Sequence, residues 1–185
     1  MSGINEAELG TSQLREAMDT ALLMNPDILS LVEWNEVNEN TSFQPTVANS
    51  RALQRLIRFY ARFLKGLPAA PNPGDDTAVP NLVVSARQTV KLGEKYRIEL
   101  LHIPDTADKG AYTVELILKN QAGKVLHTFA ADRFHYNRLT AVTYLVPSEE
   151  LADNQAVIPE LKITYQGKKL NFDALPCTRL TASEG

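Results

Sequence analysis

Residues 50–66 read SRALQRLIRFYARFLKG, and this stretch decides how the rest of the chain is interpreted. At the period of an α-helix, its apolar side chains share one face; they are Leu53, Leu56, Ile57, Tyr60 and Leu64. Four arginines recur on the opposite face; they are Arg51, Arg55, Arg58 and Arg62. Phe59 and Phe63 flank the apolar stripe, and Gly66 is well placed to end the helix.

Charge is distributed unevenly along the 185 residues, although the net charge is only −3. Residues 1–50 contain eight acidic groups and one basic group, whereas residues 51–66 contain five basic groups and no acid. The arginines could form a solvated face, pair with the acidic segment before them, dock another protein, or bind an anionic surface. We expect a solvated or internally paired face first and protein docking second, because the apolar face is needed to close a bundle.

Two further helices are expected before residue 50. Thr11 or Ser12 can cap a helix that runs to about Met24. Asn25-Pro26-Asp27 then resembles the start of a second helix, which would carry Ile28, Leu31 and Val32. The third helix would begin at Pro45 or Asn49 and run to Lys65. Three short helices make a bundle that is marginal alone and gains stability from a partner.

From Leu82 onward the hydrophobic period changes to two, which is typical of strands. Seven strands are expected, near 82–86, 95–103, 112–119, 124–131, 138–146, 157–165 and 168–173. Tight turns separate them, so the pattern favours a mainly antiparallel β-sandwich of immunoglobulin-like architecture. The predicted fold class is α+β, with a helical docking or oligomerisation segment at 1–66 and a Pro-rich linker at 67–80. The sandwich would occupy 81–176, and a tail would occupy 177–185.

No catalytic, cofactor or metal motif is present in the sequence, and we expect a protein that is not an enzyme. His102, His127 and His135 could meet Asp105 or Asp132, but their spacing matches no metal site. Cys177 is the only cysteine and lies near the end of the chain, which favours a plain thiol. The serines lie in no Gly-x-Ser-x-Gly elbow, and the glycines form no phosphate-binding loop.

The sequence therefore predicts a protein-interaction or assembly subunit. The helical segment would dock to one partner or self-associate, and the sandwich would present loops or edges to a second surface. A second candidate region is the run RFHYNR at 133–138, where arginines alternate with aromatics. The residues expected to bind a partner are Leu53, Arg55, Leu56, Arg58, Phe59, Tyr60, Arg62, Phe63, Arg133, Phe134, Tyr136 and Arg138.

One alternative function and several exclusions complete these expectations. A small molecule or carbohydrate could bind an aromatic platform made by Tyr96, Tyr112, Tyr136, Tyr144 and Tyr165. Nucleic acid is not expected as a partner, because the strand region lacks a net basic field. The first residues resemble no signal peptide, and no apolar run is long enough to cross a bilayer, which favours a cytoplasmic protein.

Overall fold

A computed structural model describes residues 11–31, 51–173, 175 and 177–182. Two α-helices come first in the described chain, α1 (Ser12–Met24) and α2 (Ala52–Leu64). Ten strands and a short 3₁₀ helix, η3 (Ser148–Leu151), follow. The strands are β1 (Leu82–Ala86), β2 (Thr89–Lys91), β3 (Lys95–His102), β4 (Ala111–Asn120), β5 (Val125–Thr128), β6 (Asp132–His135), β7 (Thr140–Pro147), β8 (Ala156–Tyr165), β9 (Lys168–Phe172) and β10 (Thr178–Thr181).

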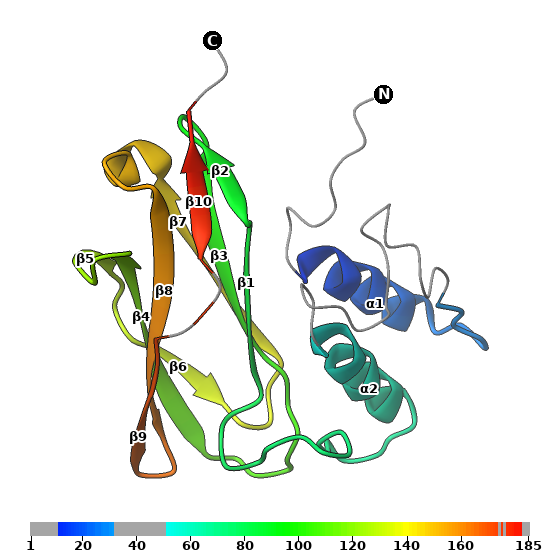
Figure 1. Ribbon diagram of the computed structural model, residues 1–185. Coiled ribbons are helices and arrows are strands. Elements are labelled where there is room, and N and C mark those ends of the chain that lie inside the picture. The colour runs from blue at the N-terminus through cyan, green and yellow to red at the C-terminus, as the bar shows by residue number, and fades with distance from the viewer. Residues whose placement is uncertain (1–10, 32–50, 174, 176, 183–185) are drawn as a thin grey trace, which may run out of the picture.

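The strands form two sheets that face each other, and the two helices lie beside the smaller sheet (Figure 1). The three-stranded sheet has the order β1-β3-β7 and is antiparallel throughout. The seven-stranded sheet has the order β2-β10-β8-β4-β5, with β6 also paired to β4 and β9 to β8. Its pairs are antiparallel except β2 with β10, which run parallel. The molecule therefore has three layers: helices, small sheet and large sheet.

The main core lies between the two sheets, because alternate side chains of each strand point inward. Ile98 and Leu100 of β3 are fully buried there, as are Leu116 and Leu118 of β4. On the opposite face of β4, Thr113 is exposed and Glu115 is half-buried, whereas Ile117 is buried.

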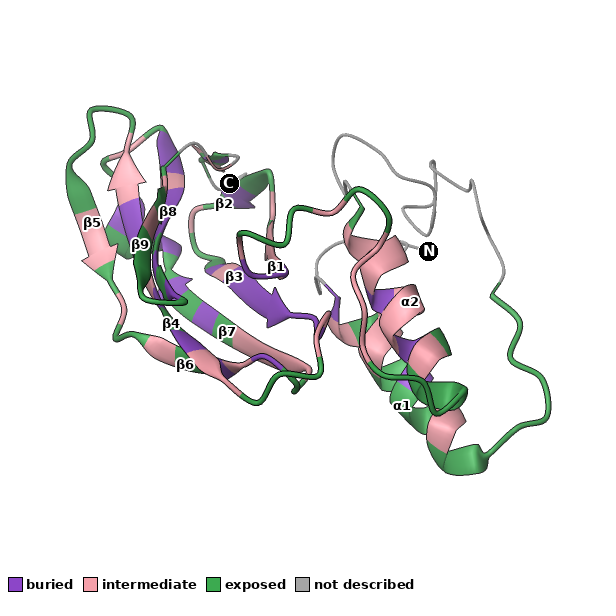
Figure 2. Cartoon of the chain, turned by 90° about the horizontal axis from the view of Figure 1, so that it is seen from below, coloured by how far each residue is buried: buried purple, intermediate pink, exposed green. Residues whose placement is uncertain are grey.

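The small sheet is different, because a second apolar cluster covers its outer face. Met18 of α1 and Leu56 and Tyr60 of α2 pack against Leu101 of β3 and Ile103. Strand β3 is therefore buried on both faces along most of its length, as the purple colour shows (Figure 2). Leu56 and Tyr60, from the apolar stripe of α2, are buried against this sheet, so the helices form a layer of the fold.

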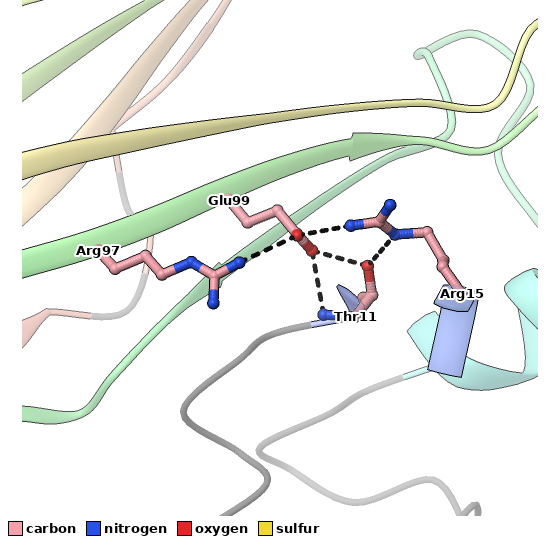
Figure 3. Close-up of polar contacts among 4 residues, drawn as sticks. All are labelled: Thr11, Arg15, Arg97 and Glu99. Atoms are coloured by element: carbon pink, nitrogen blue, oxygen red, sulfur yellow. Dashed lines mark hydrogen bonds and ion pairs between the residues drawn. The ribbon is translucent and has the colours of Figure 1, made fainter. Parts of the chain in front are cut away.

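A buried carboxylate fixes the start of α1 on this outer face (Figure 3). Oε1 of Glu99 accepts hydrogen bonds from the Thr11 amide at 3.0 Å and the Thr11 hydroxyl at 2.7 Å. Its Oε2 accepts from Arg15 Nη2 at 2.8 Å and lies 3.7 Å from Arg97 Nη2. The side chain of Glu99 is only 2% exposed. We call this group of four residues the Glu99 latch.

The predicted fold class is wrong in its element counts. The described residues form two α-helices and ten strands in two sheets, instead of about three helices and seven strands. Each of the seven expected strands is present, but β2, β6 and β10 were missed. These strands have only three or four residues each, so their hydrophobic period is too short to recognise. Strand β10 also lies within the segment that we expected to be a tail.

The ends of α1 and α2 lie where the sequence predicts them, but no helix begins at Pro26. Residues 25–31 form neither a helix nor a strand, so the expected second helix does not start at Pro26. The rest of that expected helix lies outside the described residues. Asn25 ends α1 in the left-handed conformation. Gly66 ends α2 with φ of +63°, and the Leu67 amide donates to the Arg62 carbonyl at 2.9 Å. This is the Schellman arrangement that a C-terminal glycine favours.

Removing the carboxylate of the latch should detach α1 from the sheet. Glu99→Ala removes the carboxylate that pairs with Arg15 and accepts from Thr11, so we expect the free energy of unfolding to fall by about 3–5 kcal/mol. Chemical denaturation measures the loss, and hydrogen exchange should show faster exchange in α1. Glu94→Ala is the matched control, because its ion pair with Arg87 is exposed and should contribute about 0–1 kcal/mol. Equal losses in the two variants would contradict the role of the latch.

Candidate functional site

The arginine face of α2 binds the Pro-rich segment at residues 67–80, which we call the strap. Three arginines donate hydrogen bonds to it: Arg62 Nε to the Pro68 carbonyl at 2.6 Å, Arg58 Nε to the Ala70 carbonyl at 3.4 Å, and Arg55 to Asp75 Oδ1 at 2.8 and 3.2 Å. The order of these contacts shows that the strap turns back along the helix. It contains no helix or strand, as its prolines predict.

The chemistry of the strap explains why arginines hold it. Each proline removes a backbone amide donor but keeps its carbonyl, so a Pro-rich segment has more acceptors than donors. An arginine offers five N–H groups and suits such a segment. Asp75 adds a charged acceptor whose side chain is only 6% exposed, and it also accepts from the Asn72 amide at 3.1 Å. The strap thereby carries the chain from α2 to β1 as a packed part of the molecule.

The sequence analysis expected the arginines to pair with acidic residues before α2, but the described ion pair uses an acid that follows the helix. Asp75 of the strap is the described partner of Arg55, instead of an acid from the segment before α2. Asp19 of α1 accepts a hydrogen bond from the Tyr60 hydroxyl at 2.9 Å. Burial, together with this carboxylate, raises the pKa of Tyr60. The acids at Glu33, Glu36 and Glu39 lie outside the described residues.

The predicted apolar docking residues of α2 differ in how far they are buried. Leu56 is 0% exposed and Tyr60 is 2% exposed, so both side chains are used to pack the helix on the small sheet. Leu53 and Phe59 are half-buried. Phe63 is 61% exposed and therefore remains accessible at the end of the helix.

A patch of exposed apolar side chains occupies the end of the helical layer, which we call the apolar tip. The two helices run in the same direction. Tyr60 of α2 donates a hydrogen bond to Asp19 of α1, and further along both helices Leu64 and Leu22 line the same cavity. Their C-terminal turns therefore lie together, away from the sandwich (Figure 2). The tip comprises Leu23, Met24, Ile28, Leu29, Phe63, Leu64 and Leu67. Leu23 is 88% exposed and Ile28 is 83% exposed.

A shallow cavity of about 230 Å³ opens at the tip between the two helix ends. Its lining is mostly apolar and is formed by Ala21, Leu22, Pro26, Asp27, Leu29 and Leu64. The sequence analysis did not single out this patch. The signal that could have found it is the set of large apolar residues at both helix ends, Leu23 and Met24 in one case and Phe63 and Leu64 in the other.

The run at residues 133–138 is divided between the core and the surface. Phe134 is fully buried and Tyr136 is 7% exposed, and both rings stack on Tyr112 at 5.5 and 5.9 Å between centroids. Gly110 faces the Tyr136 ring so closely that an added Cβ would lie 2.5 Å from Cε2. Arg133 and Arg138 are exposed. The aromatics therefore anchor β6 and its turn, and the two arginines lie at the surface.

A buried histidine lies beside these aromatic rings. His102 Nε2 is 3.1 Å from the Tyr136 carbonyl oxygen, and its Nδ1 is 3.0 Å from the Tyr112 hydroxyl. Burial lowers the pKa of His102, because the low-dielectric core disfavours the imidazolium. Burial raises the pKa of Asp105, with a further contribution from the charge of Asp75. Burial and the nearby Asp105 also raise the pKa of Tyr112.

The described part of the chain brings no group of three His, Cys, Asp or Glu side chains into position to hold a metal ion. His102 belongs to the aromatic cluster, and the His127 ring contacts the Phe129 ring at 4.4 Å between centroids. Cys177 is exposed. No described helix is long and apolar enough to cross a membrane.

The tyrosines that could have formed a ligand platform are buried. Tyr96 is fully buried, and the other four are at most 7% exposed; they are Tyr112, Tyr136, Tyr144 and Tyr165. A separate hollow of about 380 Å³ lies on the outer face of the large sheet. Polar and apolar residues line it, most of them from β4, β8 and β9, and they include Glu115 and Lys162, whose charged atoms lie 3.9 Å apart.

Comparison with known proteins leaves the family of this chain open. No family model matches, and no curated protein matches. A β-glucosidase from Listeria innocua aligns with a TM-score of 0.35 and 14% identity over 55% of this chain, which spans only 16% of that enzyme. An alkylpurine DNA glycosylase of Pseudomonas fluorescens, bound to DNA containing an abasic site analog, aligns with a TM-score of 0.31 and 14% identity. That alignment covers 80% of this chain and 40% of the glycosylase. Likenesses of this size assign no function.

A double-mutant cycle at Arg55 and Asp75 should show that their interaction stabilises the contact between α2 and the strap. We expect a coupling free energy of about 1–3 kcal/mol, because Asp75 is buried and accepts from two guanidinium nitrogens. Arg55→Met, Asp75→Asn and the double variant are compared by urea unfolding. The exposed pair of Arg87 and Glu94 is the matched control and should couple by less than about 1 kcal/mol. A coupling at Arg55 no larger than the control value would refute the assignment.

The buried His102 should make the protein less stable in mild acid. Its pKa is lowered in the folded state, so the unfolded chain binds more protons as pH falls through about 6.5, the unperturbed histidine value. The stability contribution is therefore complete above that pH and is lost toward the lower folded-state pKa. Asp105 works in the opposite direction at more acidic pH, because its pKa is raised.

Comparison of variants isolates the contribution of His102. The difference in unfolding free energy between the wild-type chain and His102→Gln should depend on pH between about 7 and 5. His127→Gln is the control, since His127 is only half-buried. A pH-independent difference for His102→Gln would contradict the assignment.

Proposed function

We propose that this chain is a non-enzymatic protein-interaction or assembly subunit that binds another protein through the apolar tip of its helical layer. The observation that carries this proposal is the exposure of large apolar side chains at one end of α1 and α2. Single exposed hydrophobic residues are common on protein surfaces, but contiguous patches larger than a few hundred Å² mark interaction sites. Seven such residues from two adjacent helix ends favour a binding surface.

The physical chemistry of the tip suits a protein partner. Full burial of a Leu, Ile, Met or Phe side chain contributes about 1.5–3 kcal/mol, so a partner that covers even part of the tip gains substantial free energy. The cavity between the helix ends offers a place for one inserted apolar side chain. Asp27 and Lys65 are exposed beside the apolar residues and can set the orientation of a partner.

This proposal changes the roles of the residues that we predicted to bind. Phe63 belongs to the binding surface, whereas Leu56 and Tyr60 support it from below by fixing α2 on the sheet. The arginines at 55, 58 and 62 act indirectly, because they hold the strap against the helix. The tip is thereby presented on a rigid base, which lowers the entropy cost of binding.

The sandwich would offer a second surface at the turn between β6 and β7. Arg133 and Arg138 are exposed there, while Phe134 and Tyr136 are anchored in the core. Arginine is among the residues most often important at interfaces. The turn and the apolar tip belong to different layers, so the chain could contact two partners at once (Figure 1). The alternative of an aromatic ligand platform is not carried further, because its five tyrosines are buried.

Charged substitutions at the tip should abolish binding without affecting the fold. Full-length chains carrying Met24→Asp or Phe63→Asp are compared with wild type in quantitative capture from a lysate of the source organism, with a photo-crosslinker at position 67. We expect partners crosslinked by the wild-type chain to be lost from both variants. Val125→Asp on β5 is the matched control, because Val125 is 51% exposed and lies on the far sheet. Identical crosslinked partners for all four chains would overturn the proposal.

A further inference from the structure

The free edges of the two sheets differ in length and in protection. Strands with unpaired backbone groups attract other strands, and proteins protect such edges by keeping them short or by placing charges on them. Strands β2, β5 and β6 have three or four residues each. Strand β9 has five residues and begins with Lys168 and Lys169, and β1 has five residues directly after Pro80 and Asn81.

Strand β7 lacks both kinds of protection. It has eight residues, Thr140–Pro147, and in the described chain it pairs only with β3. Its sequence, TAVTYLVP, contains no charged residue and is rich in the β-branched and aromatic types that favour strands. Proline occurs only at its last position. β7 is therefore the longest edge strand of the described sheets and carries no charge to repel another strand.

The two faces of β7 show how an added strand would be accommodated. Val142, Tyr144 and Val146 point into the core between the sheets. On the outer face the helices cover Ala141, which packs in the second apolar cluster. Leu145, opposite Arg97, lies beyond this cover and is 52% exposed. A strand added at this edge would extend the inner apolar row and cover Leu145 on the outer face.

We propose that β7 is a self-association edge, at which the β7 strand of a second copy of this chain pairs in antiparallel orientation. A two-fold axis would relate the copies, so each strand would satisfy the free backbone groups of the other. The two small sheets would become one six-stranded sheet with the order β1-β3-β7-β7-β3-β1. The helical layers would remain on the same outer face of that sheet.

The composition of the strand favours a second copy over an unrelated peptide. In a two-fold antiparallel pair, a charge close to the axis lies beside the same charge of the other copy, and like charges repel. An edge built for a different partner has no such constraint and can use complementary charges for specificity. The lack of charge in β7 means that no position of the two-fold axis along the strand would cause such repulsion.

This inference goes beyond the proposed function, because it uses the sheet edge and not the apolar tip. The two surfaces lie on different elements, so a dimer formed through β7 would display two tips. Loss of one interaction would leave the other intact, and their failures can be told apart by experiment.

The mass of the full-length chain in solution tests the proposal. Sedimentation velocity from micromolar to several hundred micromolar protein should show a monomer converting to a dimer. Thr143→Lys and Leu145→Lys should each weaken dimerisation by at least about tenfold, because each adds a like charge to both copies of an edge that carries none. Thr164→Lys is the matched control, since Thr164 is an exposed strand threonine whose strand is paired on both sides.

Hydrogen exchange identifies the edge that is used. Amides of residues 140–147 should exchange more slowly at high than at low concentration in the wild-type chain and in Thr164→Lys, but not in Leu145→Lys. Melting temperatures confirm that every variant is folded. A chain that is monomeric at all concentrations would overturn the proposal. A dimer that persists in both lysine variants would also overturn it. The same holds for a dimer that is lost only in Phe63→Asp, since that substitution changes the tip and not β7.

Discussion

The burial of Glu99 on the outer face of the small sheet is the constraint on which the molecule depends. An ionised carboxylate removed from water needs several donors, because its desolvation is costly. Thr11 and Arg15 of the α1 start supply most of them, and Arg97 supplies a further charge. The latch therefore fixes where α1 begins, and α1 in turn holds α2 against Leu101 and Ile103. A polar group thus determines the position of an apolar layer.

The basic residues of α2 illustrate how composition can mislead about function. Five basic groups in one short segment suggest an external anionic partner, yet three arginines are hydrogen-bonded to the strap that follows the helix. The reason is local: a proline-rich return leaves carbonyl groups without amide donors, and guanidinium groups satisfy them. The strap is therefore a connection that is hydrogen-bonded along α2 before the chain enters β1.

The folded chain leaves two surfaces that could bind a partner: exposed apolar side chains at the tip and unpaired backbone groups at the edge of β7. The apolar tip presents side chains whose burial is favourable for any partner of matching shape. The edge of β7 presents backbone groups whose pairing needs an extended strand in register. Because the first surface selects by shape and the second by strand geometry, they favour different partners.

The sequence by itself determined both described helices, the end of α2 at Gly66 and seven of the ten described strands, because local periodicity and turn residues encode them. It did not reveal β2, β6 and β10, which have three or four residues each and pair with strands distant in the sequence. Only the tertiary structure decided that Leu56 and Tyr60 face the sheet and that Phe63 does not, since burial depends on what lies opposite a helix. A signal was present in the run Ile98–Ile103, whose apolar residues occupy both faces of β3 and indicate cover on each side.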